Sequence, residues 1–140
     1  RDYYDEWFES AGEFLDDFRS NLEKGRLKKA AFELHQATER FYHCLFLVRT
    51  LYSPKTHNLN QLRQLAEAVE PRLKDVWPRE TKFERRCYEL LREAYVKARY
   101  SRHYRISEEQ LEWLSGRVEL LQRIVRELCE ERIAVLAEAA

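Results

Sequence analysis

An arginine and a histidine stand four residues apart in the stretch Ala98-Arg-Tyr-Ser-Arg-His-Tyr-Arg105. If a helix continues as far as His103, the side chains of Arg99 and His103 lie on one helical face. An imidazole titrates near neutral pH and can move a proton, and a guanidinium can hold a phosphate and stabilise developing charge. Such a pair needs no metal and would suit cleavage of RNA by attack of the 2′-hydroxyl, with Tyr100 and Tyr104 as candidates for stacking on bases.

The same stretch also has a purely structural interpretation. Basic and aromatic residues at the C-terminus of a helix complement the helix macrodipole and cover the edge of a core. A lone Arg-His pair is a weak motif, so the spacing alone favours this structural interpretation over a catalytic one.

Charge is unevenly distributed along a chain whose formal net charge is zero. Acidic residues dominate from position 2 to 23, and basic residues dominate from position 85 to 105. One basic element on a neutral protein predicts a local anion site, such as a phosphate site, rather than a surface that coats DNA. The alternative is that the basic helix packs beside the acidic first helix. The anion-site hypothesis assigns nucleotide or substrate binding to Arg99, Tyr100, Arg102 and Arg105.

A second polar line consists of His35, Glu39 and His43, which are spaced by four. Two histidines and a carboxylate at this spacing can bind a metal, but helical metal sites usually need further carboxylates from facing helices. We therefore expect no metal and no cofactor, and interpret these residues as buried or interfacial polar groups that are hydrogen-bonded across the bundle or a dimer axis. His35 and Glu39 are included among the candidate nucleotide- or substrate-binding residues. His57, just before a predicted helix, is expected to make a loop and capping contact, and the less favoured alternative is a third polar group near the cleft.

Apolar spacing and capping signals predict five helices that position these residues. Asn58 with Gln61, Thr81 with Glu84, and Ser107 with Gln110 have the spacing of capping boxes, and Gly25 suits a left-handed helix end. The predicted ranges are about Tyr3 to Leu22, about Leu27 to Leu51, Asn58 to near Pro71, a fourth helix that opens at Thr81 and carries Phe83 inward, and Ser107 to about Leu136. Short connections between four long helices and one short helix predict an all-α, up-and-down bundle.

The last predicted helix is apolar over an unusually broad arc. Trp113, Leu120 and Ile124 widen its apolar stripe beyond what one core face requires. A helix of this kind usually buries a second face, and a homodimer contact is the simplest partner.

Composition excludes several classes of protein. The chain is 44% hydrophobic and 36% charged, which argues against a disordered segment, and its few glycines and prolines argue against a sheet protein. Three widely separated cysteines, Cys44, Cys87 and Cys129, are typical of reduced thiols in a cytoplasmic protein. No apolar run is long enough to span a bilayer, and no Gly-rich phosphate loop, Ser-His-Asp arrangement or pair of catalytic carboxylates is visible.

Three stretches together resemble the HEPN family (higher eukaryotes and prokaryotes nucleotide-binding domain). They are Ala30-Ala-Phe-Glu-Leu-His-Gln-Ala-Thr-Glu-Arg-Phe-Tyr-His-Cys-Leu-Phe, Thr56-His-Asn-Leu with Leu62 after it, and the segment from Tyr95 to Tyr100. The resemblance extends over nearly the whole chain and implies a four- or five-helix bundle that commonly dimerises.

The resemblance also implies one of two functions. Some HEPN proteins are metal-independent ribonucleases, often of toxin-antitoxin systems, with an Arg-x4-6-His motif near the end of a helix. Others are fused to, or lie beside, a minimal nucleotidyltransferase and look like its substrate- or nucleotide-binding partner. A chain without methionine fits a single HEPN domain, residues 1–140, excised from a longer nucleotidyltransferase–HEPN polypeptide.

The ribonuclease motif maps onto Arg99 and His103, but the spacing here is Arg-x3-His. One residue rotates a helical side chain by about 100°, so only local unwinding after Tyr100 would restore the family's geometry. The sequence also leads directly into Tyr104-Arg105 and a new cap at Ser107, which leaves little room for a flexible loop. We therefore rank a non-catalytic binding module for a nucleotidyltransferase first, a ribonuclease that uses Arg99 and His103 second, and a helical adaptor without a ligand third.

Overall fold

The described part of the chain contains four long helices and two short ones. The computed structural model describes residues 2–50 and 52–139, and these contain no strand. The long helices are α1 (Asp2–Glu23), α2 (Leu27–Arg49), α4 (Lys82–Tyr100) and α5 (Glu108–Ala139), and the short ones are α3 (Leu59–Val69) and the 3₁₀ helix η1 (Pro71–Val76). The predicted all-α bundle of four long helices and one short helix is confirmed, with η1 as an additional turn that sequence patterns did not reveal.

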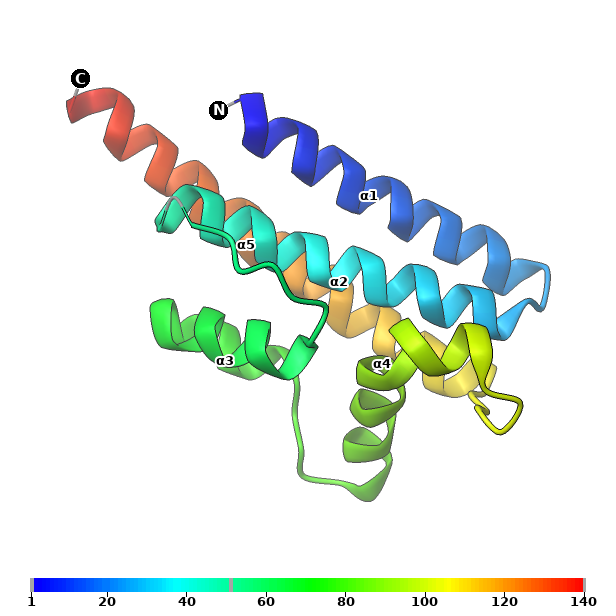
Figure 1. Cartoon of the computed structure of the whole chain (residues 1–140). Helices are drawn as coiled ribbons and strands as arrows, with labels where there is room; N and C mark the ends of the chain where they lie inside the picture. Colours follow the sequence, from blue (N-terminus) through cyan, green and yellow to red (C-terminus); the bar gives the residue numbers. More distant parts are fainter. Residues whose placement is uncertain (1, 51, 140) are drawn as a thin grey trace.

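Helix α2 lies at the centre of the bundle. In Figure 1, α1, α2 and α5 run lengthwise beside one another, while α3 and α4 lie on the side of α2 away from α1. The apolar stripe of α2 is fully buried, as shown by Leu34, Phe41 and Leu45 at 0% exposure. Burial of several such side chains, each worth about 1.5–3 kcal/mol, makes α2 the main source of core stability. Because α4 packs chiefly against α2, the acidic helix α1 is not the principal neighbour of the basic helix, contrary to one of the two sequence-based interpretations.

The helix ends follow the predicted capping chemistry. Gly25 adopts φ 72° after α1, a conformation that costs glycine little because it has no Cβ. Thr81 and Glu84 form a complete capping box at the start of α4, and Ser107 and Gln110 exchange the same pair of bonds before α5. Asn58 caps α3 by accepting from the Gln61 backbone N–H at 3.2 Å. The predicted end of the second helix at Leu51 lies outside the described residues.

One prediction about an apolar side chain was wrong, and a second, the homodimer contact on α5, stays a prediction. Phe83 was expected to point into the core, but it is 37% exposed and packs edge-on against Trp113 of α5. The broad apolar arc of α5 is also largely covered within the chain, since Ile124 is buried and Trp113 is half-buried against Phe83 and Arg117. The breadth of this arc therefore does not require a partner chain.

The sequence predicts no membrane-spanning helix. Within the described residues, no helix combines the length and the apolar character needed to cross a bilayer.

Candidate functional site

Helix α4 ends at Tyr100, so the candidate catalytic residue His103 lies beyond it. Ser101 leaves the helical conformation with φ −92° and ψ 127°, and its side-chain oxygen accepts the backbone N–H of His103 at 3.2 Å. Residues 101–107 form the connection to α5. The condition under which Arg99 and His103 would share one helical face is therefore not met, because His103 lies beyond the helix, exposed on this connection.

Tyr104 anchors this connection to the bundle. Its ring is only 4% exposed, and its hydroxyl donates a hydrogen bond to the Leu90 carbonyl at 2.6 Å. Burial raises the pKa of the Tyr104 phenol above its usual value. Tyr104 is therefore not available to stack on a base, contrary to the sequence-based expectation, whereas Tyr100 is 75% exposed.

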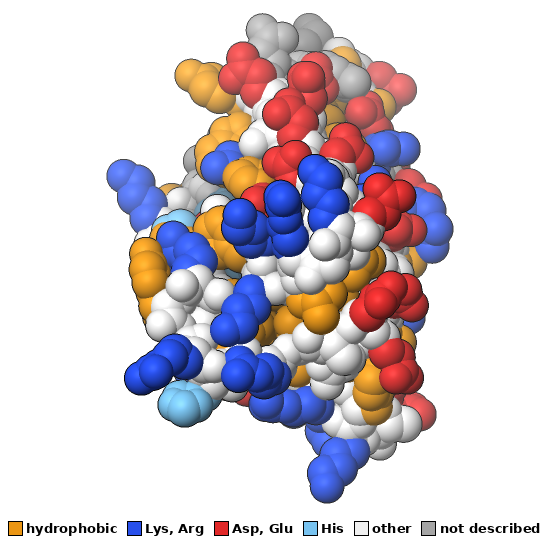
Figure 2. Space-filling view, turned by 90° about the vertical axis from the view of Figure 1, so that its right-hand side faces the viewer, with side chains coloured by type: hydrophobic (Ala, Val, Ile, Leu, Met, Phe, Trp, Pro, Cys, Tyr) orange, Lys and Arg blue, Asp and Glu red, His pale blue; other side chains and the backbone are white. Residues whose placement is uncertain are grey.

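The last turn of α4 and the first turn of α2 together line a groove of about 620 Å³. We call it the basic groove. Its lining residues are Asn21, Lys28, Lys29, Phe32, Glu33, Ala98 and Arg99. Figure 2 shows this end of the molecule, where Lys and Arg side chains gather around exposed hydrophobic surface and most Asp and Glu side chains lie toward the edges. The groove has the volume of a small-molecule site.

The first turn of α2 makes the basic groove electropositive. It contains Lys28 and Lys29 but no acidic residue, and Arg26 at the N-cap position makes no side-chain capping bond. A helix N-terminus already carries a partial positive charge, so lysines there oppose the usual preference for acids and increase the attraction for an anion. Lys28 Nζ also donates to the Ser101 carbonyl at 3.4 Å, which links the groove to the connection after α4.

Arg99 is held in place by aromatic rings. Its guanidinium carbon lies 4.5 Å from the ring centroid of Phe32, 4.7 Å from that of Tyr95 and 4.9 Å from that of Tyr100. Its Nε donates to the Tyr95 carbonyl at 2.9 Å. These contacts orient the guanidinium and leave its two terminal nitrogens for a ligand, an arrangement suited to bidentate contact with a phosphate.

One acidic residue also lines the basic groove. Burial, and then the negative charge of Asp17, raise the pKa of Glu33 above its usual value. Glu33 is thus the one acidic group of the groove, and its carboxylate opposes an anion when it is ionised.

The remaining predicted ligand-binding residues lie near the basic groove but do not line it. Arg102 and Arg105 are exposed on the connection. The Arg105 guanidinium donates to the carbonyls of Arg102 and Tyr104 at 2.6 and 2.9 Å. Arg105 thus helps to fix the connection, while Arg102 projects from it.

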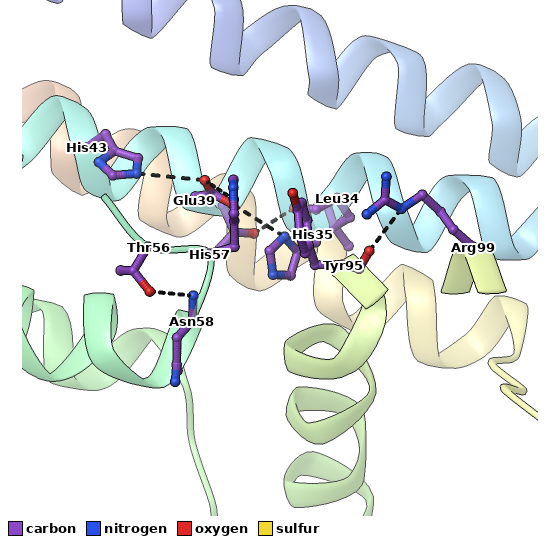
Figure 3. Close-up of polar contacts among 10 residues, drawn as sticks. Leu34, His35, Glu39, His43, Thr56, His57, Asn58, Tyr95 and Arg99 are labelled. Atoms are coloured by element: carbon purple, nitrogen blue, oxygen red, sulfur yellow. Dashed lines mark hydrogen bonds and ion pairs between the residues drawn. The ribbon is translucent and has the colours of Figure 1, made fainter. Parts of the chain in front are cut away.

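A cluster of polar side chains surrounds Glu39 of α2, near Tyr95 of α4 (Figure 3). Glu39 is 7% exposed, and His57 Nδ1 lies 2.8 and 3.0 Å from its two carboxylate oxygens. His35 Nδ1 and His43 Nε2 lie 3.7 and 3.8 Å from Glu39, which is beyond hydrogen-bond distance. His43 Nδ1 instead contacts the Ser53 hydroxyl. The expected burial of His35, Glu39 and His43 is confirmed, but the expected hydrogen bonding is not found at His35, whose two ring nitrogens have no partner. The role of His35 and Glu39 in ligand binding stays a prediction.

Burial and charge act in opposite directions on this cluster. Burial lowers the pKa of His35 to about 4, because the neighbouring Glu39 carboxylate only partly offsets the cost of charging a fully buried imidazole. Burial alone would raise the pKa of Glu39, but contacts with His43 and His57 outweigh it and lower the pKa below the usual value. At neutral pH the cluster therefore contains a neutral His35 and an ionised Glu39.

His57 plays a different part from the one predicted. Asn58, not His57, caps α3, and the His57 ring stacks on Tyr95 with centroids 4.1 Å apart and planes 11° apart. No group of three or more His, Cys, Asp or Glu side chains among the described residues is arranged to hold a metal ion.

Sequence reasoning missed Lys28, Lys29, Phe32 and Tyr95 as site residues. Local spacing cannot reveal that the first turn of α2 meets the last turn of α4. One signal was present in the sequence: two lysines without an acid at the start of a predicted helix go against the usual charge preference.

The sequence model of the HEPN domain matches residues 4–128 of the chain. This match covers most of the chain and agrees with the helical architecture, so the protein belongs to the HEPN family. The comparison with curated proteins found no match.

Proposed function

We propose that this chain is a HEPN module that binds the phosphate group of a nucleotide in the basic groove and supports a nucleotidyltransferase domain or partner. The observation that carries the proposal is the convergence of Lys28, Lys29 and the aromatic-held Arg99 on one groove. In this site the lysines and the terminal nitrogens of Arg99 contact the phosphate, and Phe32 offers an apolar surface to the rest of the ligand.

The proposal assigns no bond-breaking step to the bundle itself. The groove residues with charge are cations and Glu33, and no oriented acid–base pair lines it. Lysine and arginine keep their protons near pH 7 and so bind and orient phosphate rather than transfer protons. Chemistry would then belong to the nucleotidyltransferase. A signature of that enzyme, Gly-Ser followed by paired aspartates, is expected in the same polypeptide or a neighbouring gene, and its absence from both would count against this part of the proposal.

A calorimetric titration with AMP tests the binding. Arg99→Ala and Lys28→Ala are each expected to weaken AMP binding at least tenfold, because a charge-assisted hydrogen bond is worth about 1.5–3 kcal/mol. Lys74→Ala is the matched control, since it removes one exposed positive charge on η1, outside the basic groove. Equal affinities for wild type, Arg99→Ala and Lys74→Ala would contradict the proposal.

A ribonuclease remains the second candidate, and the end of α4 favours it. Because the helix stops at Tyr100, His103 is no longer held at the unfavourable helical rotation that the Arg-x3-His spacing implied. His103 would act as general acid and base, and Arg99 would stabilise the phosphorane. RNA that stays intact with the purified protein in EDTA near neutral pH would rule this candidate out. Cleavage lost in both His103→Ala and Arg99→Ala would support it.

A further inference from the structure

His57 is oriented by contacts on two sides. It lies in the segment between α2 and α3, and Glu39 of α2 holds its Nδ1 at 2.8 and 3.0 Å. Tyr95 of α4 stacks against its ring. These two contacts fix both the position and the plane of the imidazole (Figure 3). The side chain nevertheless remains 52% exposed, so its other edge is open.

The Glu39 contact determines which nitrogen is open. An ionised carboxylate only accepts hydrogen bonds, so Nδ1 must donate its proton to Glu39. The lowered pKa of Glu39 supports this assignment. Nε2 is then the nitrogen that can contact a ligand, as an acceptor in the neutral ring and as a donor in the imidazolium.

The open edge of His57 lines a second groove, of about 490 Å³. We call it the histidine groove, and its lining residues are His57, Asn58, Arg92, Glu93, Tyr95, Val96 and Lys97. Two cations, Arg92 and Lys97, line it together with one carboxylate, Glu93, which lies 3.8 and 3.4 Å from them. Arg92 is also paired with Glu89 on the same helix, at 2.6 Å. Asn58 marks the N-terminus of α3, whose first turn contains no acidic residue. The positive end of α3 therefore adds to the two cations.

We propose that the histidine groove is a second ligand site, in which Nε2 of His57 makes a hydrogen bond to a phosphate group. Glu39 is its positioning residue, because it touches the imidazole and not the ligand. Lys97 supplies a nearby positive charge, since it lines the same groove. This site is separate from the basic groove and does not depend on the function proposed for it.

A simple tether between the α2–α3 segment and α2 would need only Nδ1 of His57. It would not need a stacked ring with its second nitrogen open in a groove beside two cations. The two explanations differ at Nε2 alone, and that atom is the target of the test.

The neighbours of His57 on α2 keep their charge near neutral pH. The groups facing His57 are His35, Glu39 and His43 from α2 and Arg92, Glu93, Tyr95 and Lys97 from α4, while α3 contributes the uncharged Asn58. Between pH 6 and 8, His35 stays neutral and Glu39 stays ionised, because the pKa of each lies below this range.

Ring ¹⁵N–¹H spectra of the histidines provide the test. The chain has four histidines, so their ring signals can be assigned one by one. Titration of the wild-type chain with inorganic phosphate at pH 6.5 and constant ionic strength should shift the Nε2 signal of His57 to saturation. The buried His35 serves as the internal reference and should not move.

The conservative variant His57→Asn distinguishes a ligand contact by Nε2 from a structural contact by Nδ1. In His57→Asn the side-chain amide can still donate to Glu39 from near the Nδ1 position, but no atom replaces Nε2. We expect wild-type thermal unfolding and at least a tenfold loss of phosphate affinity, followed through the backbone amides of Asn58 and Lys97. Phosphate that leaves the His57 signals unchanged, or binds the His57→Asn chain as tightly as wild type, overturns the inference.

The variant Arg99→Ala also distinguishes phosphate binding in the histidine groove from ligand binding in the basic groove. In Arg99→Ala the His57 shifts should persist even where AMP affinity is lost. If phosphate moves only signals of the basic groove, the proposed function stands and the histidine site fails.

Discussion

Arg99 and His57 both contact the ring of Tyr95, but they differ in what fixes them. Cation–π contacts and one backbone carbonyl hold Arg99, whereas a buried carboxylate holds His57. Sequence spacing identified Arg99 correctly as an exposed cation at a helix end. It could not identify the partner of His57, because Glu39 lies 18 residues away and the two meet only when the segment between α2 and α3 runs back along α2.

His35 predicts a pH dependence of stability that belongs to a single side chain. Its folded pKa of about 4 lies below the usual value of 6.5, so the unfolded chain binds the proton more tightly. Stability is therefore fully present above about pH 6.5 and is lost as the pH falls toward 4. Between pH 7 and pH 5 this one group should cost about 2 kcal/mol of unfolding free energy.

Urea unfolding at the two pH values measures this contribution. His35→Phe removes the titrating group and should reduce the loss between pH 7 and pH 5 by about 2 kcal/mol. Both ring nitrogens of His35 lack a hydrogen-bond partner, so no bond is broken by the change. His103→Gln, at an exposed position, should leave the loss close to that of wild type. An unchanged pH dependence in His35→Phe would show that the pKa of His35 is the same in the folded and the unfolded chain, and would contradict the prediction.

Among the elements, the connection between α4 and α5 differs most from its sequence-based prediction. The capping residues at Asn58, Thr81 and Ser107 were readable because capping is local chemistry over a few residues. The end of α4 at Tyr100 could not be predicted from local sequence, because the connection after it is held by a tertiary contact between Tyr104 and Leu90. The same contact turns a predicted base-stacking residue into a core anchor.

Tyr104→Phe should destabilise the chain by about 1 kcal/mol, because it keeps the buried ring and removes one hydrogen bond. Tyr100→Phe is the matched control at an exposed position and should have no measurable effect. Thermal or denaturant unfolding of both variants measures the difference. Equal stability of the two variants would mean that the hydroxyl of Tyr104 does not hold the connection.

For the whole molecule, composition and periodicity were enough to predict an all-α bundle with α2 as a long buried helix. The basic groove was not predictable as a groove, because it joins residues 28–33 to residues 98–99 across the bundle. The broad apolar face of α5 is a weaker argument for a homodimer than the sequence suggested, because Trp113 and Ile124 pack against other side chains of the same chain. Exposed apolar side chains remain on α4, where Val96 and Tyr100 lie one turn apart, 58% and 75% exposed.

We therefore expect the chain to form a homodimer in solution through this surface of α4. The mass measured by light scattering should be twice that of one chain, and Val96→Asp should shift it to the mass of a monomer, because a buried unpaired charge opposes association. Val135→Asp, on the exposed C-terminal turns of α5, is the control and should remain a dimer. A wild-type chain that is strictly monomeric contradicts this expectation.

The central claim is that the basic groove binds a phosphate-bearing ligand, and mapping of backbone amide shifts with AMP tests it most directly. The predicted result is a saturable set of shifts centred on Lys28, Phe32 and Arg99, which weakens as salt is added because the contact is between charges. Shifts that do not saturate, or that leave these three residues unaffected, would contradict it.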